Sequence, residues 1–209
     1  RLSVTAFREY IACPYRYVIR RELRLSSIDD EVRELTAPAF GSLIHDVLSH
    51  FGKSAVREAI KSELIESFLL NELRRQSLRR FGRDRSATVS VQLQMIEDRL
   101  RSFARWQAGV AAEGWRITHT EVDLEYPEFL DIQDRPVALI GRVDRIDQHR
   151  STGEWRVLDY KTSESADKPE LTHQKKGEWV DLQLPLYRLL VRSLGIDGDL
   201  QLGYIHLPG

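Results

Sequence analysis

The chain has 209 residues, of which 42% are hydrophobic and 30% are charged, and its formal net charge at pH 7 is −1. This composition is typical of a globular protein with one sizeable core, and it excludes an overall basic nucleic-acid-binding module, although a local patch could still steer a partner. One cysteine excludes an internal disulfide framework, no apolar run approaches a membrane span and no secretory signal opens the chain, so we expect a cytoplasmic protein.

The first forty residues predict one short helix and a linker. The chain opens at Arg1 rather than at a methionine and ends on a strand-like segment, so we expect a domain cut from a longer protein. Residues 3–12 predict a helix with Ser3 as its N-cap, and Pro14 breaks it. Residues 26–38 are polar and predict a linker.

Residues 39–52 predict an amphipathic helix, because apolar side chains recur there every three or four residues. His45 lies at the edge of the apolar face, one turn after Gly41, whose small size would let the helix approach a sheet closely. A lone histidine at such a place usually has a structural role. The predicted buried face comprises Phe40, Leu43, Ile44, Val47, Leu48 and Phe51.

Two long helices are predicted next, over residues 53–81 and 88–113. Six arginines gather within residues 74–85, and they are equally consistent with a solvated helix end and with phosphate contacts. The predicted core positions are Val56, Ala59, Ile60, Leu64, Phe68 and Leu69 in the first helix, and Leu93, Ile96, Leu100, Phe103, Trp106 and Val110 in the second.

Three strands are predicted after the helices. Residues 117–126 alternate strictly between two kinds of side chain, which places Glu121 on the polar face. An acidic face of this kind usually protects an edge strand from aggregation. Residues 137–147 and 155–162 predict two antiparallel strands joined by a polar turn that contains Gly153.

The second and third strands carry the candidate chemistry. Asp159 and Lys161 are two residues apart and therefore project from one face, and strand pairing can bring Asp144 beside Asp159. Two carboxylates at close range repel each other unless a cation shares the site, and Mg²⁺ binds one or two carboxylates together with phosphate oxygens. A metal there can activate water, and the lysine can orient that water or offset negative charge. The pattern suits metal-assisted phosphodiester hydrolysis, although a D-x-K triplet alone more often marks a solvated face.

A polar stretch without any period follows Lys161 and predicts a mobile loop beside the site. Lys175 and Lys176 within it could contact DNA, although loop lysines are more often simply solvated. After this loop and one further helix, the last predicted strand covers residues 200–206.

The helix between the loop and the last strand covers residues 179–195 in this prediction and ends at Gly195. Gln183 and Tyr187 are four residues apart and therefore share one face of it. Pro185 indicates either a kink or a late start of the helix.

Four short motifs now identify a family resemblance. They are FGSLIH, which ends at His45, GRVDRID, which contains Asp144, DYKT, which contains Asp159 and Lys161, and QLPLY, which contains Gln183 and Tyr187. In this order they resemble the nuclease domain of the RecB-like exonucleases, within the PD-(D/E)XK superfamily, across the whole chain. The resemblance implies an α/β fold with a restriction-endonuclease-like αβββαβ core, in which helices flank a central mixed sheet. It implies one nuclease domain over residues 1–209, with a helical insertion at 53–113 over the active-site cleft.

The resemblance also implies roles for individual residues. The implied ligands of Mg²⁺ or Mn²⁺ are His45, Asp144, Asp159 and the backbone carbonyl of Tyr160. The implied catalytic residues are Lys161, Asp144, Asp159, Gln183 and Tyr187, with Glu121 as a further candidate because the family carries a glutamate at the start of this strand. Arg142 and Arg145 flank the acidic site, where they would either contact phosphate or have a structural role.

The implied function is that of a metal-dependent DNA exonuclease domain, which hydrolyses phosphodiester bonds of single strands or duplex ends in DNA repair and recombination, together with a helicase domain or subunit. In some family members a cysteine at the position of Cys13 begins an iron–sulfur cluster, but Cys13 alone cannot build one, so a cluster would require a longer parent protein. The alternative is a catalytically silent, nuclease-like module that binds DNA or serves as a helicase platform. Residues that can bind a metal or act as the lysine occupy all of the family's corresponding positions, which argues against that alternative.

Overall fold

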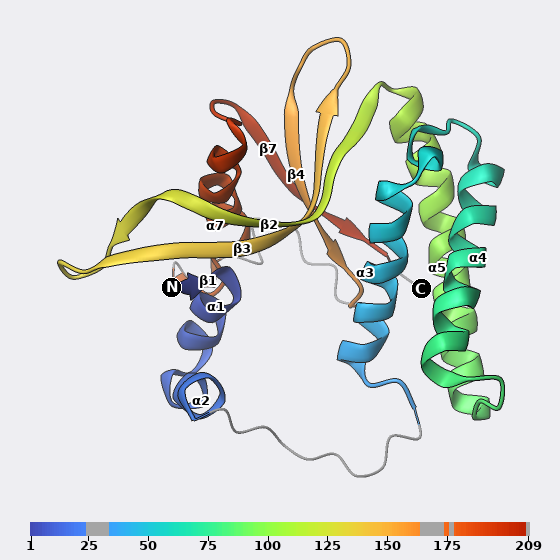
Figure 1. Ribbon diagram of the computed structural model, residues 1–209, viewed down its shortest axis with the longest axis horizontal. Coiled ribbons are helices and arrows are strands. Elements are labelled where there is room, and N and C mark those ends of the chain that lie inside the picture. Colours follow the sequence, from blue (N-terminus) through green and yellow to red (C-terminus); the bar gives the residue numbers. More distant parts are fainter. Residues whose placement is uncertain (24–33, 164–173, 176–177, 208–209) are drawn as a thin grey trace.

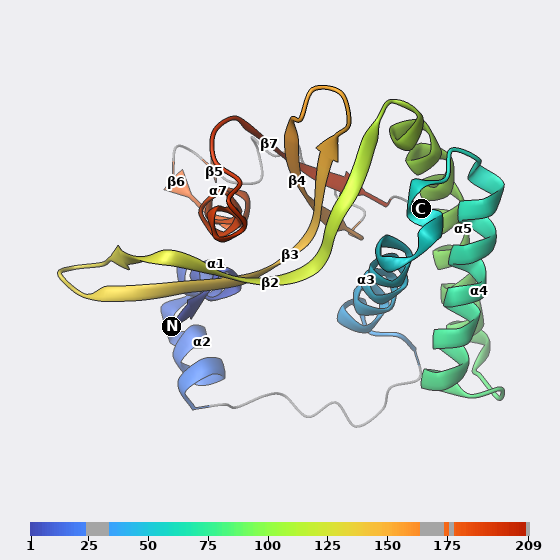
Figure 2. The ribbon, with the colours of Figure 1, turned by 45° about the horizontal axis from the view of Figure 1, so that its top comes forward.

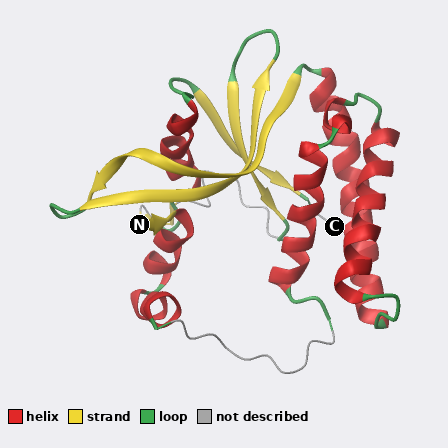
Figure 3. Cartoon of the chain, viewed as in Figure 1, coloured by secondary structure: helices red, strands yellow, loops and turns green. Residues whose placement is uncertain are grey.

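A five-stranded mixed sheet forms the centre of the computed structural model, which describes residues 1–23, 34–163, 174–175 and 178–207 (Figure 1). Helices cover both faces of this sheet (Figure 3). The predicted α/β architecture, a central mixed sheet flanked by helices, is therefore confirmed.

Strand β3 is the spine of the sheet. β2 runs antiparallel along one edge of β3, while β4, antiparallel, and β1, parallel, share its other edge, and β7 extends the sheet in parallel beyond β4. The predicted antiparallel pairing is confirmed, since Arg145 lies opposite Leu158 and Gln148 opposite Trp155. The strands are β1 (Leu2–Ser3), β2 (Trp115–Asp131), β3 (Pro136–His149), β4 (Trp155–Lys161) and β7 (Leu200–His206).

Two groups of helices lie on opposite sides of the sheet in both views (Figure 1, Figure 2). One group comprises α3 (Ala37–Lys53), α4 (Ser62–Phe81) and α5 (Ala87–Ala112), with the short η2 (Ala55–Glu58) between the first two. The other comprises α1 (Val4–Ala12), followed by α2 (Pro14–Tyr17) and η1 (Val18–Glu22), and α7 (Gln183–Leu190), followed by η3 (Val191–Leu194). None of the described helices has the length and apolarity that a membrane crossing requires.

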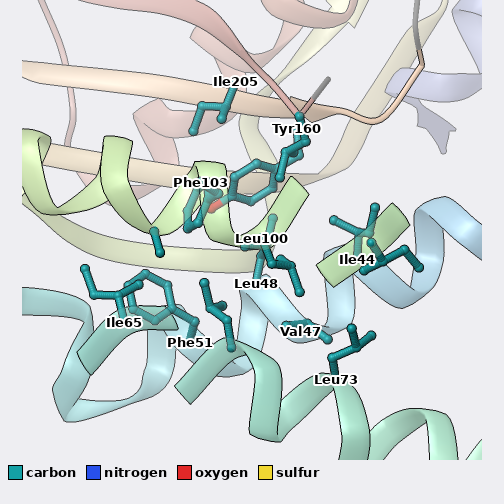
Figure 4. Packing of buried hydrophobic residues seen from close by; sticks show 14 of the residues in the cluster. Ile44, Val47, Leu48, Phe51, Ile65, Leu73, Leu100, Phe103, Tyr160 and Ile205 are labelled. Carbon is teal, nitrogen blue, oxygen red and sulfur yellow. The ribbon is translucent and has the colours of Figure 1, made fainter. Parts of the chain in front are cut away.

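Two clusters of buried apolar side chains hold these layers on the sheet. The first joins α3, α4 and α5 to β4 and β7, and Phe51, Phe103 and Tyr160 meet edge to edge within it (Figure 4). The second lies between the sheet and the helices α1 and α7, and it contains Val4 and Leu190. Each fully buried side chain of this size contributes about 1.5–3 kcal/mol, so the sheet is anchored from both sides.

Helix α3 follows its sequence pattern closely. The Thr36 hydroxyl accepts a hydrogen bond from the amide of Ala39 and caps its start. Phe40 packs against the first cluster, as predicted. The other predicted core positions are all completely buried: Leu43, Ile44, Val47, Leu48 and Phe51. The helix therefore presents a fixed face to the sheet, with His45 at its edge.

The first helix of the following pair begins later than predicted. Residues 55–58 form the separate η2 turn, and α4 starts only at Ser62. The predicted core residue Ile60 therefore precedes the helix and is exposed. Within α4 the buried face passes through Ile65 and Leu69, which are completely buried, and it leaves the predicted core residue Leu64 exposed. The assignment of residues 53–113 as an insertion stays a prediction.

The segment after β4 also differs from the predicted loop and the predicted helix over residues 179–195. A small two-stranded sheet of β5 (Gln174–Lys175) and β6 (Glu178–Trp179) comes first, and α7 begins only at Gln183. Pro185 thus lies in the first helical turn, where no N–H needs an intrahelical partner, so the late start is the observed alternative. Most of the predicted loop, including Lys176, lies outside the described residues.

Candidate active site

A pocket of about 330 Å³ opens where β3 and β4 separate. The described pairing of these two strands ends at Arg145 and Leu158, so Asp144 and Asp159 stand just beyond it and face the pocket. Its walls come from α1, α3, β3, β4 and α7. Among the described residues that line it, none comes from α4 or α5; α4 packs against α3, and α5 against α4.

Asp144 links the two separating strands. Its Oδ2 accepts a hydrogen bond of 2.9 Å from the amide of Tyr160, and only 7% of the residue is exposed. Burial, with the nearby charge of Asp159, raises the pKa of the Asp144 carboxyl to about 7. The ionised form of this carboxylate is therefore costly unless a cation shares the pocket.

Asp159 and Lys161 lie together, as their spacing predicts. The Lys161 ammonium lies 2.7 Å from Asp159 Oδ2 and donates a 3.0 Å hydrogen bond to Gln183 Oε1. The Gln183 amide donates in turn to Asp159 Oδ1 at 2.5 Å, and the Tyr187 hydroxyl lies 3.3 Å from the same oxygen. The DYKT strand and the QLPLY helix thus form one hydrogen-bonded unit.

His45 reaches the pocket from α3, which lies on the side of the sheet opposite α1 and α7 (Figure 1, Figure 2). Its Nδ1 lies 3.2 Å from Glu121 Oε1 and 3.6 Å from Asp144 Oδ2. Burial opposes the charged imidazolium, but the hydrogen bond to Glu121 and the neighbouring carboxylates outweigh burial and raise the pKa of His45. The ring stands edge-on to Tyr160, with centroids 5.7 Å apart, which fixes its orientation.

Glu121 interrupts the predicted strict alternation of β2. It has a φ of 46°, a left-handed conformation that is unusual for a residue with a side chain. Thr120 consequently lies against Gly52 of α3, whereas Val122 packs with the second cluster on the opposite face. Because regular alternation would put residues 120 and 122 on one face, the backbone turn at Glu121 is what directs its carboxylate toward His45.

Two residues that line the pocket, His45 and Asp144, have the arrangement of a metal site together with Glu121 beside them. The nearest ligand atoms of His45, Glu121 and Asp144 all lie within 4.8 Å of one another. Carboxylate oxygens are the ligands that Mg²⁺ and Mn²⁺ prefer, and an imidazole favours Mn²⁺. The residues therefore fit the predicted divalent cation, with Glu121 more central than the sequence alone suggests.

The two strand arginines have different surroundings. Arg145 is completely buried and donates to Asp147 at 2.7 and 2.8 Å and to Gln107 at 2.6 Å. This burial contradicts the prediction that Arg145 contacts DNA and leaves the structural alternative. Arg142 lines the pocket, but its guanidinium is bound to Asp123 through two hydrogen bonds of 2.7 and 2.8 Å. Of the two loop lysines, Lys175 belongs to β5, and Lys176 is not described.

Two pocket residues, Arg8 and Asp181, are not predicted from the sequence. Arg8 projects from α1 on the side of Val4, one turn earlier, and both line the pocket. Asp181 is 4% exposed, and its Oδ1 accepts a 2.8 Å hydrogen bond from the amide of Gln183. An aspartate two residues before a helix is a capping signal that could have identified it.

Arg99 is a third unpredicted residue, outside the pocket. It is 3% exposed on α5, and its Nη1 donates a 2.6 Å hydrogen bond to the carbonyl of Thr162, next to Lys161. Thr162 also lies against Gly41 of α3, where a Cβ would approach its hydroxyl to 3.2 Å. The end of the DYKT strand is thus held by two helices.

Comparison with known proteins agrees with this geometry. Residues 1–209 match the PD-(D/E)XK nuclease superfamily. The chain is 27% identical over 203 residues to an ATP-dependent helicase/deoxyribonuclease subunit from Clostridium acetobutylicum, covering 90% of this chain and 17% of that protein. It is 27% identical over 182 residues to the protein of the same name from Clostridium perfringens (strain SM101 / Type A), covering 77% and 15%, respectively. The chain therefore spans less than a fifth of the length of these relatives.

Proposed function

The chain belongs to the PD-(D/E)XK nuclease superfamily, and we propose that it is a nuclease domain that hydrolyses phosphodiester bonds of DNA with a divalent metal. The observation that carries this proposal is the convergence of Asp144, Asp159 and Lys161 in one pocket. Asp159 and Lys161 come from the end of β4 and Asp144 from the interior of β3, so the sheet fixes their relative positions.

We propose that the metal ligands are His45, Glu121, Asp144 and Asp159, with the backbone carbonyl of Tyr160, and that the ion is Mg²⁺ or Mn²⁺. Such an ion supplies Lewis acidity, which favours attack by water and stabilises charge on the phosphoryl group. The four proposed side-chain ligands are each held by another group, with Asp159 bonded by Gln183. His45 is oriented by Glu121, and Asp144 by the amide of Tyr160.

Lys161 is the proposed catalytic cation. Its ammonium is already held between Asp159 and Gln183, so it needs no rearrangement to meet a phosphate. There it would orient the attacking water and offset the negative charge that develops on the phosphoryl oxygens. Gln183 and Tyr187 would act by fixing Asp159, to which both are hydrogen-bonded.

The relatives' name supports a role beside a helicase, because they are called helicase/deoxyribonuclease subunits. We propose that this domain is the nuclease part of such a protein, that it removes nucleotides from DNA ends, and that it works in repair and recombination. The cytoplasmic location remains a prediction.

A cleavage assay with matched variants tests this function. End-labelled single-stranded, double-stranded and circular DNA are incubated with the protein in Mg²⁺, Mn²⁺ or EDTA. We expect loss of linear DNA only with metal, no loss of the circle, and a drop of about a hundredfold to a thousandfold for Lys161→Ala, as for removal of a charge-stabilising group. Lys53→Ala, which removes an exposed lysine at the end of α3, is the control.

The other outcomes are equally informative. Metal-dependent cleavage of the circle would replace the exonuclease mode by an endonuclease mode. Full activity of folded Lys161→Ala would contradict the assigned role of this lysine. DNA binding without any cleavage by the unmodified protein would instead favour the silent module.

A further inference from the structure

The cations that line the pocket differ in whether a carboxylate already pairs with them at short range. Among the described residues, its lining includes the carboxylates of Asp144, Asp159 and Asp181 and three permanent cations, Arg8, Arg142 and Lys161. A DNA strand would bring one further negative charge with each nucleotide. The phosphates beside the cleaved bond therefore need a cation that is not already neutralised by an acid.

Two of the three cations are already paired at short range. Arg142 forms two hydrogen bonds with Asp123, in the bidentate geometry that Arg and carboxylate prefer. Lys161 lies 2.7 Å from Asp159 and donates to Gln183. Neither can turn to a second phosphate without losing these contacts.

Arg8 is different, because its nearest carboxylate is beyond hydrogen-bond distance. Its Nε lies 3.6 Å from Asp181 Oδ2, while the other oxygen of that carboxylate accepts from the amide of Gln183. Its side chain is 64% exposed, whereas that of Asp181 is 5% exposed. The buried acid can thus aim the guanidinium across the pocket without occupying its donors.

The position of α1 adds a second observation. A larger hollow of about 620 Å³ adjoins the pocket, and Val4, Thr5, Arg142 and Tyr187 line both of them. The start of α1 therefore forms a wall common to the site and to a continuous depression beside it. A strand that enters the site along this depression passes α1, from which Arg8 projects.

We propose that Arg8 binds a phosphate of the substrate strand next to the one that is cleaved. This proposal rests on the nuclease function proposed above. A guanidinium presents several donors in one plane and matches two oxygens of a phosphate. Arg8 would therefore hold the strand in register without contacting the reacting atoms.

Steady-state kinetics and binding separate this role from a structural one. For Arg8→Ala we expect a KM about tenfold higher and a kcat changed less than about twofold, because an exposed phosphate contact stabilises the bound strand at every stage. The slope of log K against log salt for a single strand should fall by about 0.7, the value for one lost phosphate contact. Arg16→Ala, which removes an exposed arginine of α2, should change neither quantity.

A methylphosphonate scan identifies the phosphate itself. Single-stranded oligonucleotides, each with one neutral methylphosphonate, are bound in EDTA so that the strand stays intact. One position should weaken binding of the unmodified protein about tenfold and binding of Arg8→Ala less than about twofold, since the partner is already missing. Thermal unfolding of both variants verifies their fold.

The outcomes distinguish this proposal from the proposed function. Suppose that the protein cleaves DNA but that Arg8→Ala behaves as Arg16→Ala does, or loses as much affinity as the unmodified protein at every methylphosphonate position. Arg8 is then not a phosphate ligand, and the nuclease function stands. If nothing is cleaved but the scan shows the expected loss, Arg8 is a ligand of a silent module. Absence of any binding to the oligonucleotides would overturn the proposal.

Discussion

Two groups of buried charges lie three residues apart on β3, and they differ in how their charges are balanced. Asp147 is completely buried and accepts hydrogen bonds from two arginines, Arg145 at 2.7 and 2.8 Å and Arg156 at 3.0 and 2.8 Å. Asp144 is nearly as buried, but His45 is its only described basic neighbour within 4.0 Å, and the carboxylates of Asp159 and Glu121 raise its pKa further.

This difference separates a structural group from a candidate site. At Arg145 the charge of Asp147 outweighs the effect of burial and raises the pKa, whereas at the less deeply buried Arg156 burial prevails and lowers the pKa, so Arg145 and Asp147 are the mutually stabilised pair of the first group. The group around Asp144 has more acid than base and stays unfavourable until a cation arrives. Tyr160 connects the two, because its ring lies beside the buried arginine and its amide donates to Asp144.

Breaking the balanced group should have the largest effect on stability. Arg145→Met leaves Asp147 with one arginine and Gln107 without its donor, so we expect the free energy of unfolding to fall by about 3–5 kcal/mol, measured by urea denaturation. Arg142→Met is the matched control on the same strand. Its pair with Asp123 is exposed, and its loss should cost less than about 1 kcal/mol. Equal effects of the two substitutions would contradict the distinction.

Neutralising the unbalanced group should act in the opposite direction. The folded pKa of Asp144 is raised from 3.8 to about 7, so the folded protein binds more protons than the unfolded chain between these values and loses stability as pH rises through them. Asp144→Asn removes this loss. In EDTA we expect its advantage over the unmodified protein to grow by roughly 2 kcal/mol between pH 5 and pH 8. If urea denaturation gives the same difference in free energy of unfolding between the two proteins at pH 5 and at pH 8, the surroundings of Asp144 do not raise its pKa.

Arg99 tests whether the helices α3 and α5 control the site from a distance. Arg99→Met keeps much of the buried packing on Phe40 but leaves the Thr162 carbonyl unpaired, which should cost about 2 kcal/mol of stability. Because Lys161 precedes that carbonyl, we also expect kcat to fall about tenfold with little change in KM. Arg105→Met, on the exposed side of the same helix, should change neither. A loss of stability without a loss of kcat would restrict Arg99 to a structural role.

Much of this arrangement follows from local sequence patterns. The 3.6-residue period places His45 beside the buried face of α3, the two-residue period places Asp159 and Lys161 together, and the four-residue spacing brings Gln183 and Tyr187 to the same carboxylate. These residues lie on regular elements, where spacing alone decides direction.

The remaining features depend on partners that are distant in the sequence. The two-residue spacing predicts only that Arg145 and Asp147 share a face, whereas the burial of Arg145 depends on Gln107 of the distant α5. Ile60 is exposed because α4 begins only at Ser62, and Leu64 is exposed because tertiary packing turns the face of Ile65 and Leu69 toward the first cluster. Arg8 joins the site only because α1 packs beside α7.

The left-handed backbone at Glu121 has a consequence for how such a domain could change over evolutionary time. Glycine adopts this conformation without strain, and losing a carboxylate relieves the acidic group, so Glu121→Gly should stabilise the metal-free protein by roughly 1 kcal/mol while weakening Mn²⁺ binding in calorimetry. Glu125→Gly, on the same strand, should only destabilise. A descendant no longer selected for cleavage would therefore gain stability by losing this glutamate. A glycine at position 121 would then indicate that the domain had become a scaffold.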